Sequence, residues 1–177
     1  GGGMLCAMGI LLALFERHRS GKGQVVDAAM VDGSAGFSTL FHGMLAHNLM
    51  TLDIGTNPLD GGAPFYQTYE TSDGLYMAVG AVEQRFYGAL LEGLELDPAT
   101  LPHQFDMQQW PQMIERFEEV FKTKTRDEWT SVFQGKDACV APVLNLNEVG
   151  EHPHNRERNL IIDVDGIPQP APAPRLS

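Results

Sequence analysis

The first hydrophobic segment of the chain predicts a helix without a clear polar face. Residues 4–15 are uncharged and apolar on nearly every side of a helix. Arg17 and Arg19 in the following turn, and Gly21 after it, are typical of a helix end. A helix that is apolar all round belongs inside a larger protein, so this segment needs covering layers.

Residues 24–50 continue this apolar character. Residues 24–27 predict a short strand. Residues 28–50 are rich in Ala, Leu, Met and Phe and almost free of charge, which predicts a second buried helix. Gly33 and Gly36 are its weak points, because glycine lowers helix stability.

Glycine and proline then mark a loop at residues 51–64, followed by a β-hairpin. Residues 66–71 and 75–82 flank the turn sequence at 72–74, and apolar residues alternate along the second segment as they do in strands. The sequence therefore predicts two antiparallel strands joined by a tight turn.

Helical spacing dominates the following residues. The pattern predicts a helix after Glu83, a second one after Pro111, and a third opened by a capping box at residues 125–128. The apolar stripe of the second helix contains Trp110, Met113, Ile114, Phe117, Val120 and Phe121. A strand at 138–140 stopped by Pro142, a short helix at 147–149, and an extended polyproline tail over the last ten residues complete the expected elements.

These patterns divide the chain into four parts. Residues 1–50 form an apolar helical segment, and 51–64 a glycine-rich linker. Residues 65–150 form a small α+β domain, and 151–177 an extended segment.

Charge supports this division. The 177 residues carry a formal net charge of −11, with 12 basic and 23 acidic side chains, yet only three of each lie in the first fifty residues. The acidic balance argues against a nucleic-acid binder, which normally presents a basic face to phosphates.

Other function classes find little support. The longest uncharged apolar run has 12 residues, whereas a membrane-spanning helix needs about 20. Cys6 and Cys139 lie far apart and favour lone thiols in a reducing compartment, which is the cytoplasm or, in a eukaryote, an organelle such as a peroxisome or mitochondrion. His152 and His154 lack the spacing of a helical zinc site, so no metal site is expected.

Two places carry candidate chemistry. Glu83 follows an apolar strand and stands at the start of a helix, where the helix dipole favours a carboxylate. It is either a simple helix-end acid or an acceptor that orients a partner imidazole. In the loop before the hairpin, Gly61 and Gly62 allow close approach of a ligand to the backbone, and neighbouring apolar residues could line a pocket.

At these places the sequence resembles the family III CoA-transferases. The resemblance rests on residues 1–10, 21–33, 57–66, 78–83 and 137–144, and it runs over essentially the whole chain in the family's order. The segments 59–66 and 78–83 are similar to the racemase branch of that family. Family members are about twice as long, so the resemblance implies the second half of such a protein.

The resemblance implies an α/β fold in which a large Rossmann-like domain is joined by long linkers to a small α+β domain. Residues 1–50 would be the end of the large domain and the linker helix, 65–150 the small domain, and 151–177 an extended return linker. Two subunits of the family interlock, so an intertwined homodimer is implied.

For the racemase branch, the resemblance implies epimerisation of 2-methyl-branched acyl-CoA thioesters by removal and return of the α-proton. No cofactor is expected beyond the coenzyme A that belongs to the substrate. Glu83 matches the carboxylate that supports a catalytic His. The Asp and His themselves would lie upstream of Gly1, so the chain is expected to be inactive by itself. The implied walls of the acyl site are Leu59, Asp60, Gly61, Tyr66 and Val82.

Two alternatives stay open. The chain could be part of a family III CoA-transferase in which the upstream Asp is a nucleophile. It could also be a non-catalytic module that binds acyl chains or dimerises through its methionine-rich surface.

Overall fold

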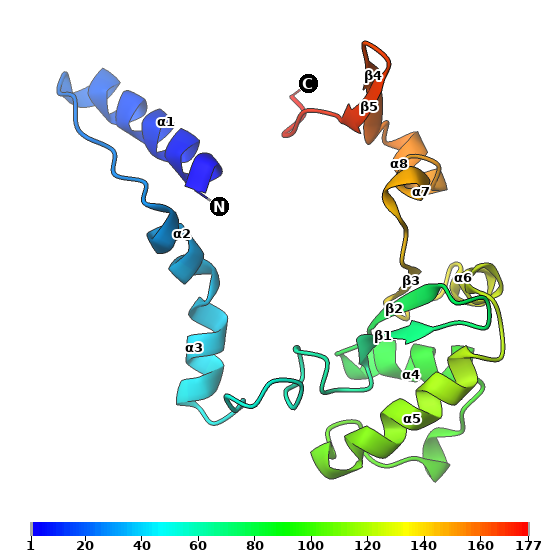
Figure 1. The fold of residues 1–177 in the computed structure, drawn as a ribbon. Coiled ribbons are helices and arrows are strands. Elements are labelled where there is room, and N and C mark those ends of the chain that lie inside the picture. Colours follow the sequence, from blue (N-terminus) through cyan, green and yellow to red (C-terminus); the bar gives the residue numbers. More distant parts are fainter. Residues whose placement is uncertain (1, 177) are drawn as a thin grey trace. The chain divides into compact units, whose positions relative to one another are not determined.

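The structure is a computed structural model that describes residues 2–176 (Figure 1). It divides the chain into two compact units, with the boundary between Asn57 and Pro58. This boundary lies within the glycine-rich segment at 51–64.

The first unit is helical. It contains α1 (Gly2–Ser20), α2 (Met30–Phe37) and α3 (Thr39–Ala46). Helix α1 ends as its sequence predicts: Gly21 has a φ of +72°, and its N–H donates to the carbonyl of Arg17 at 2.8 Å. A left-handed residue after the last turn is the geometry that glycine adopts at little cost.

The region predicted as one helix over 28–50 is two helices that meet at Ser38. The hydroxyl of Ser38 donates to the carbonyl of Ala35 at 2.8 Å, and the hydroxyl of Thr39 donates to the carbonyl of Gly36 at 2.8 Å. Such local bonds offer the backbone an alternative to continuing the helix. The break at Ser38 therefore lies two residues after Gly36, one of the two glycines that weaken the segment.

Two further expectations for this unit are wrong. Residues 24–27 form no strand, because between residues 2 and 57 the structure has only helices and no strand to pair with. The helices are also not buried here: α1 has no buried residue, Met4 is 74% exposed and Phe15 is 76% exposed. The apolar faces lack the covering layers that their sequence needs.

The second unit contains a three-stranded antiparallel sheet of β1 (Tyr66–Glu70), β2 (Tyr76–Gly80) and β3 (Val140–Pro142), in the order β1-β2-β3. The predicted hairpin is confirmed. The third strand starts later than predicted, because Cys139 has a φ of +50° and cannot extend the strand. Pro142 lies within β3, which is an edge strand and tolerates the missing N–H.

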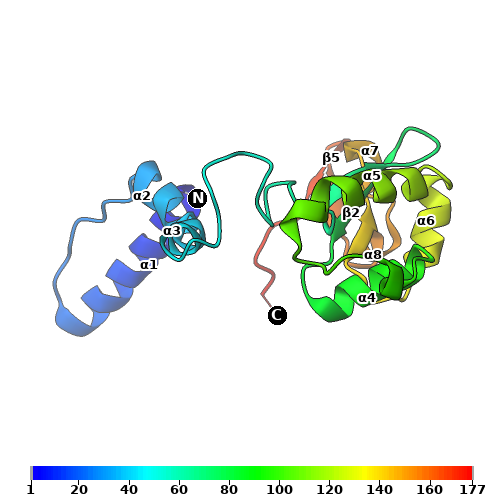
Figure 2. The same cartoon turned by 90° about the horizontal axis from the view of Figure 1, so that it is seen from below.

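Helices α4 (Gln84–Gly93) and α5 (Trp110–Phe121) cover one face of this sheet, as the two views in Figures 1 and 2 show. Short 3₁₀ turns at Pro98–Thr100 and Met107–Gln109 lie between them. The apolar stripe predicted for α5 is confirmed, since four of its residues are buried and two are packed against the core. Helix α6 (Arg126–Phe133) begins with the predicted capping box of Thr125 and Glu128.

The last part of this unit contains α7 (Leu146–Val149), α8 (Pro153–Glu157) and a hairpin of β4 (Ile161–Val164) with β5 (Ile167–Pro170). The expectation of an unpacked polyproline tail is wrong at β5. In the ladder the N–H of Ala171 donates to the carbonyl of Leu160 at 2.9 Å. In an antiparallel ladder only every second residue of a strand donates its N–H to the neighbouring strand. Pro168 and Pro170 occupy the positions between these donors, where an N–H would point away from β4, so the ladder loses no bond.

A buried arginine links three segments of this unit. The guanidinium of Arg126 donates to both carboxylate oxygens of Glu148, at 2.6 and 3.0 Å, and to the carbonyl of Val143 at 3.0 Å. Its backbone N–H faces the carboxylate of Asp73 in the hairpin turn, at 3.3 Å. Paired, charge-assisted bonds of this kind are the strong hydrogen bonds of proteins.

The ion pair of Arg126 with Glu148 predicts that the free energy of unfolding falls at acidic pH. The hydrogen bonds from Arg126, and then the backbone bond from Asn145, lower the pKa of Glu148 from 4.5 to about 2. A carboxylate with a lowered pKa contributes stability that is complete above pH 4.5 and is lost as the pH falls toward 2. We expect Glu148→Gln to unfold at lower urea than the unsubstituted chain at pH 6, with the difference vanishing near pH 2. Glu157→Gln, an exposed carboxylate on α8, should follow the unsubstituted chain throughout; a Glu148→Gln difference that persists at pH 2 would contradict this assignment.

Candidate functional site

A hollow of about 720 Å³ lies on the sheet of the second unit, and we call it the sheet groove. Its walls come from the loop before β1, from β1 and β2, and from the residues around the start of β3. They are Leu59, Asp60, Gly61, Tyr66, Gln67, Thr68, Ala78, Val79, Gly80, Cys139 and Ala141.

Small side chains form the floor of the sheet groove. Thr68 pairs with Ala78 across β1 and β2, and Ala78 pairs with Ala141 across β2 and β3. Gly80 stands opposite Tyr66 in the same ladder. Because side chains alternate between the faces of a strand, these residues lie on the opposite face from the buried Met77. The floor is therefore shallow and largely apolar, which suits an extended hydrocarbon chain.

The loop wall of the groove is held against β1. Gly61 has a φ of +92°, and its carbonyl accepts a hydrogen bond from the amide of Gln67 at 3.0 Å. The carboxylate of Asp60 accepts from the N–H of Gly62 at 3.2 Å. The left-handed backbone at Gly61 explains the need for glycine there, since other residues adopt it only with strain.

Glu83 lies directly before α4, as its N-cap residue. Its carbonyl accepts from the N–H of Tyr87 at 2.9 Å, but its exposed side chain makes no capping bond. Burial raises the pKa of the Cys139 thiol, and the nearby carboxylates of Asp137 and Glu83 raise it further, while Arg85 lowers it. The N–H of Gly80, three residues before Glu83, donates to the carbonyl of Cys139 at 2.9 Å, so the backbone that leads to Glu83 lies against the Cys139 side of the groove.

The structure thus brings together four of the six site residues that the sequence indicates. Leu59, Asp60, Gly61 and Tyr66 line the sheet groove, and Glu83 stands near its Cys139 wall. Val82 is half-buried and packs against the hydrophobic core, and it does not line the groove.

Sequence reasoning missed most of the floor. The outward positions Thr68, Ala78 and Gly80 follow from the strand alternation, and that pattern could have identified them. Cys139 lies directly before β3 and Ala141 within it, about 60 residues further along, and only the sheet pairing of β2 with β3 brings them to the groove.

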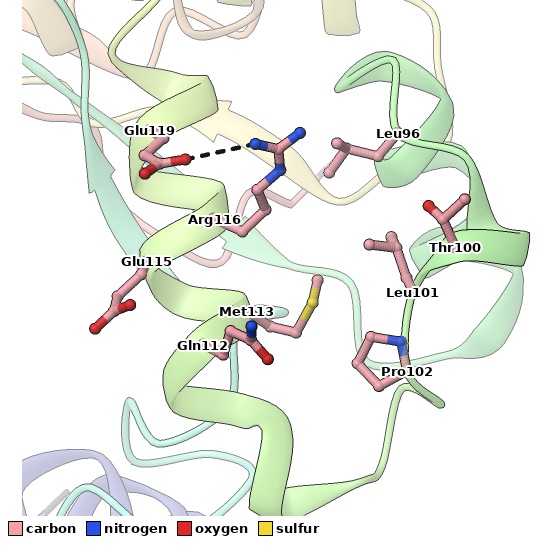
Figure 3. A pocket seen from close by; sticks show the side chains of 9 residues that line it. All are labelled: Leu96, Thr100, Leu101, Pro102, Gln112, Met113, Glu115, Arg116 and Glu119. Carbon is pink, nitrogen blue, oxygen red and sulfur yellow. Dashed lines mark hydrogen bonds and ion pairs between the residues drawn. The ribbon is translucent and has the colours of Figure 1, made fainter.

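A second hollow of about 450 Å³ lies between α5 and the loop that precedes it (Figure 3). Leu96, Leu101 and Pro102 on the loop side face the Met113 side of the helix. The charged groups at its rim are exposed, and Arg116 pairs with Glu119 at 3.5 Å. None of the site residues indicated by the sequence lies in this hollow.

The described part of the chain contains neither a cluster of metal-ligand side chains nor a membrane-spanning helix. Among residues 2–176, no group of three or more His, Cys, Asp and Glu side chains could hold a metal ion. The two cysteines are free. Over the same residues, every helix is too short or too polar to cross a bilayer.

Comparison with known proteins matches the whole chain to one family and finds relatives that share about half of its residues. The family model of CoA-transferase family III matches residues 1–177. The chain is 51% identical to the mouse protein named alpha-methylacyl-CoA racemase and 50% identical to its human counterpart, covering 100% and 97% of this chain. The chain spans about half the length of these curated relatives, 47% and 46%.

A solved structure shares the fold. The crystal structure of a CaiB/BaiF family protein from Brucella suis superposes with a TM-score of 0.73 at 24% identity, over 99% of this chain and 47% of the other. The mixed α/β arrangement therefore matches about half of a family structure.

Proposed function

Because the chain belongs to CoA-transferase family III, we propose that it is the second half of an α-methylacyl-CoA racemase. The complete protein would epimerise 2-methyl-branched acyl-CoA thioesters. The observation that carries this proposal is the identity of about half of all residues, along the whole chain, with two proteins named as that racemase.

The chemistry requires a base and an acid at the α-carbon. The thioester makes the α-proton acidic enough for a side chain to remove it, and return of a proton to the other face inverts the centre. In this proposal an Asp and a His from the sequence upstream of Gly1 do this work. Glu83 accepts a hydrogen bond from the His imidazole and holds its orientation, as carboxylates do in catalytic dyads. Its exposed carboxylate, without a capping bond, supports this role.

The sheet groove would hold the acyl chain. Leu59, Asp60, Gly61 and Tyr66 form one wall above a floor of small residues, and the floor leaves room for a branched chain. Val82, two residues after the end of β2, would support the site from the core through the backbone that connects β2 to Glu83. The neighbourhood of Glu83 and Cys139 supports placing the α-carbon at that end of the groove.

Residues 1–50 would be the end of the large domain with the linker helix, 65–150 the small domain, and 151–177 the return linker. The exposed apolar residues of α1 support this division, since they need cover from residues outside the chain. The family relationship further suggests an intertwined homodimer, in which the groove of one subunit serves the catalytic residues of the other.

The test is exchange of the α-proton. A 2-methylacyl-CoA is incubated in deuterated water with the chain alone, or with the same chain preceded by its upstream coding sequence, and deuterium at C2 is measured by mass spectrometry. We expect no exchange with the chain alone and clear exchange with the longer protein, which should sediment as a dimer. Exchange by the chain alone would contradict the proposal that the Asp and His come from the sequence upstream of Gly1. Transfer of CoA to acceptor acids without exchange would identify a transferase, and a monomeric longer protein would contradict the dimer.

A further inference from the structure

A buried glutamine stands behind the backbone that carries Glu83. Gln104 is 7% exposed and lies in the loop between α4 and α5. Its side-chain amide nitrogen donates to the carbonyl of Ala81 at 3.2 Å and to the carbonyl of Val82 at 2.8 Å. Both acceptors are more than 20 residues away in the chain. One side chain therefore fixes the two peptide groups that immediately precede Glu83.

The orientation of this amide follows from its surroundings. If nitrogen and oxygen exchanged places, the oxygen would face two carbonyl oxygens and no donor. The observed orientation instead leaves the Gln104 oxygen buried without a partner in the described structure. An unpartnered buried oxygen costs free energy, and the two bonds to the Ala81 and Val82 carbonyls offset that cost.

Gln104 is itself held by the core. Its carbonyl accepts a hydrogen bond from the indole N–H of Trp110 at 2.9 Å. The Trp110 ring packs edge-on against Phe65 at 5.7 Å, and the carbonyl of Phe65 accepts from the N–H of Ala81 at 2.9 Å. These contacts close a ring of Ala81, Gln104, Trp110 and Phe65, in which Ala81 lies two residues before Glu83 and Phe65 directly before the groove residue Tyr66.

From this geometry we infer that Gln104 is a positioning residue: it sets the location of Glu83 relative to the sheet groove. The inference rests on the proposed function for the role of Glu83. Gln104 itself does not line the groove. Its loss should therefore impair the chemical step while leaving acyl binding intact.

The first experiment uses the chain itself. Gln104→Met keeps a similar volume and removes both donors. The variant loses the two buried hydrogen bonds to the carbonyls of Ala81 and Val82, so this segment should open more often. We therefore expect the backbone amide of Ala81, which donates to Phe65, to exchange with deuterium roughly tenfold faster. The amide of Leu94 at the end of α4, which donates to Leu90, should be unchanged. The matched control is Trp129→Phe. It removes one buried hydrogen bond, from the Trp129 indole N–H to the carbonyl of Phe121 at 2.8 Å, and this bond involves neither Ala81 nor Val82.

The second experiment measures turnover in the longer protein. Gln104→Met should lower kcat roughly 10- to 100-fold, since small displacements of catalytic groups have effects of this size, with KM within about twofold. Trp129→Phe should lower thermal stability but leave kcat within about twofold. If Gln104→Met does not fold, Gln104→Asn, whose amide is too short to reach both carbonyls, should show the same direction in both measurements.

The outcomes separate the two proposals. If the longer unsubstituted protein has no α-proton exchange, the proposed function fails, and amide exchange at Ala81 still decides whether Gln104 fixes this backbone. Equal Ala81 exchange in the Gln104 and Trp129 variants, or a rise in KM at constant kcat, would overturn the positioning role.

Discussion

In the longer protein, Glu83→Gln is expected to lower kcat by roughly 10²- to 10⁴-fold, with little change in KM. The amide keeps the shape of the side chain but has no negative charge, so it neither stabilises an imidazolium nor fixes the tautomer of the partner His. KM should change little because Glu83 does not line the sheet groove. Steady-state epimerisation of a 2-methylacyl-CoA, measured by deuterium incorporation, provides both constants.

Folding should not obscure this result. Glu83 is exposed and makes no capping bond, so its substitution should change the unfolding free energy by less than about 0.5 kcal/mol. Glu115→Gln on α5, an exposed carboxylate at the rim of the other hollow, is the matched control and should retain full activity. A Glu83→Gln protein with unchanged kcat would remove Glu83 from the mechanism.

The largest loss of stability is expected from Phe65→Ala. Phe65 is 0% exposed and makes edge-on contacts with the rings of Tyr87, Phe105 and Trp110. Truncation of a fully buried phenylalanine costs about 3–5 kcal/mol, because the cavity relaxes only partly. Urea unfolding followed by fluorescence reports this directly, since both tryptophans of the chain lie in the same core.

Phe105→Ala tests the same ring contact from its exposed side. Phe105 is 49% exposed, so its removal opens little buried volume and should cost only about 1 kcal/mol, the value of one aromatic pair. Equal losses in the two variants would mean that Phe65 is not the centre of this core.

Local patterns predicted much of the second unit. The hairpin was predictable because alternation at Met77 and Val79 and the turn at 72–74 both act over neighbouring residues. The start of α6 was predictable because a capping box is complete within four residues. Each of these features is stabilised by partners that lie close in the chain.

The errors share a different cause. A strand at 24–27 needs a neighbouring strand, and the prolines of β5 pair because β4 lies beside them. Neither condition can be read from the segment itself. Burial of a helix likewise depends on what packs against it, so an apolar pattern predicted α1 and α2 but not the exposure of their apolar side chains.

The candidate site was only partly predictable for the same reason. The loop residues around Gly61 were predictable from the glycine-rich composition of the loop, and Glu83 was predictable from its position before a helix. Gln104 showed no pattern, because its role depends on two carbonyl groups more than 20 residues earlier. Positioning residues of this kind become visible only when the distances are known.

The Arg126 pair has a consequence for how the chain opens. Its partners Val143 and Glu148 follow it by 17 and 22 residues, and its backbone is tied to the turn of the hairpin. Detachment of α7 would take the two Glu148 carboxylate oxygens away from a largely buried guanidinium, which is strongly unfavourable. We therefore expect the segment Leu146–Val149 to open together with α6 and the sheet, as one cooperative unit.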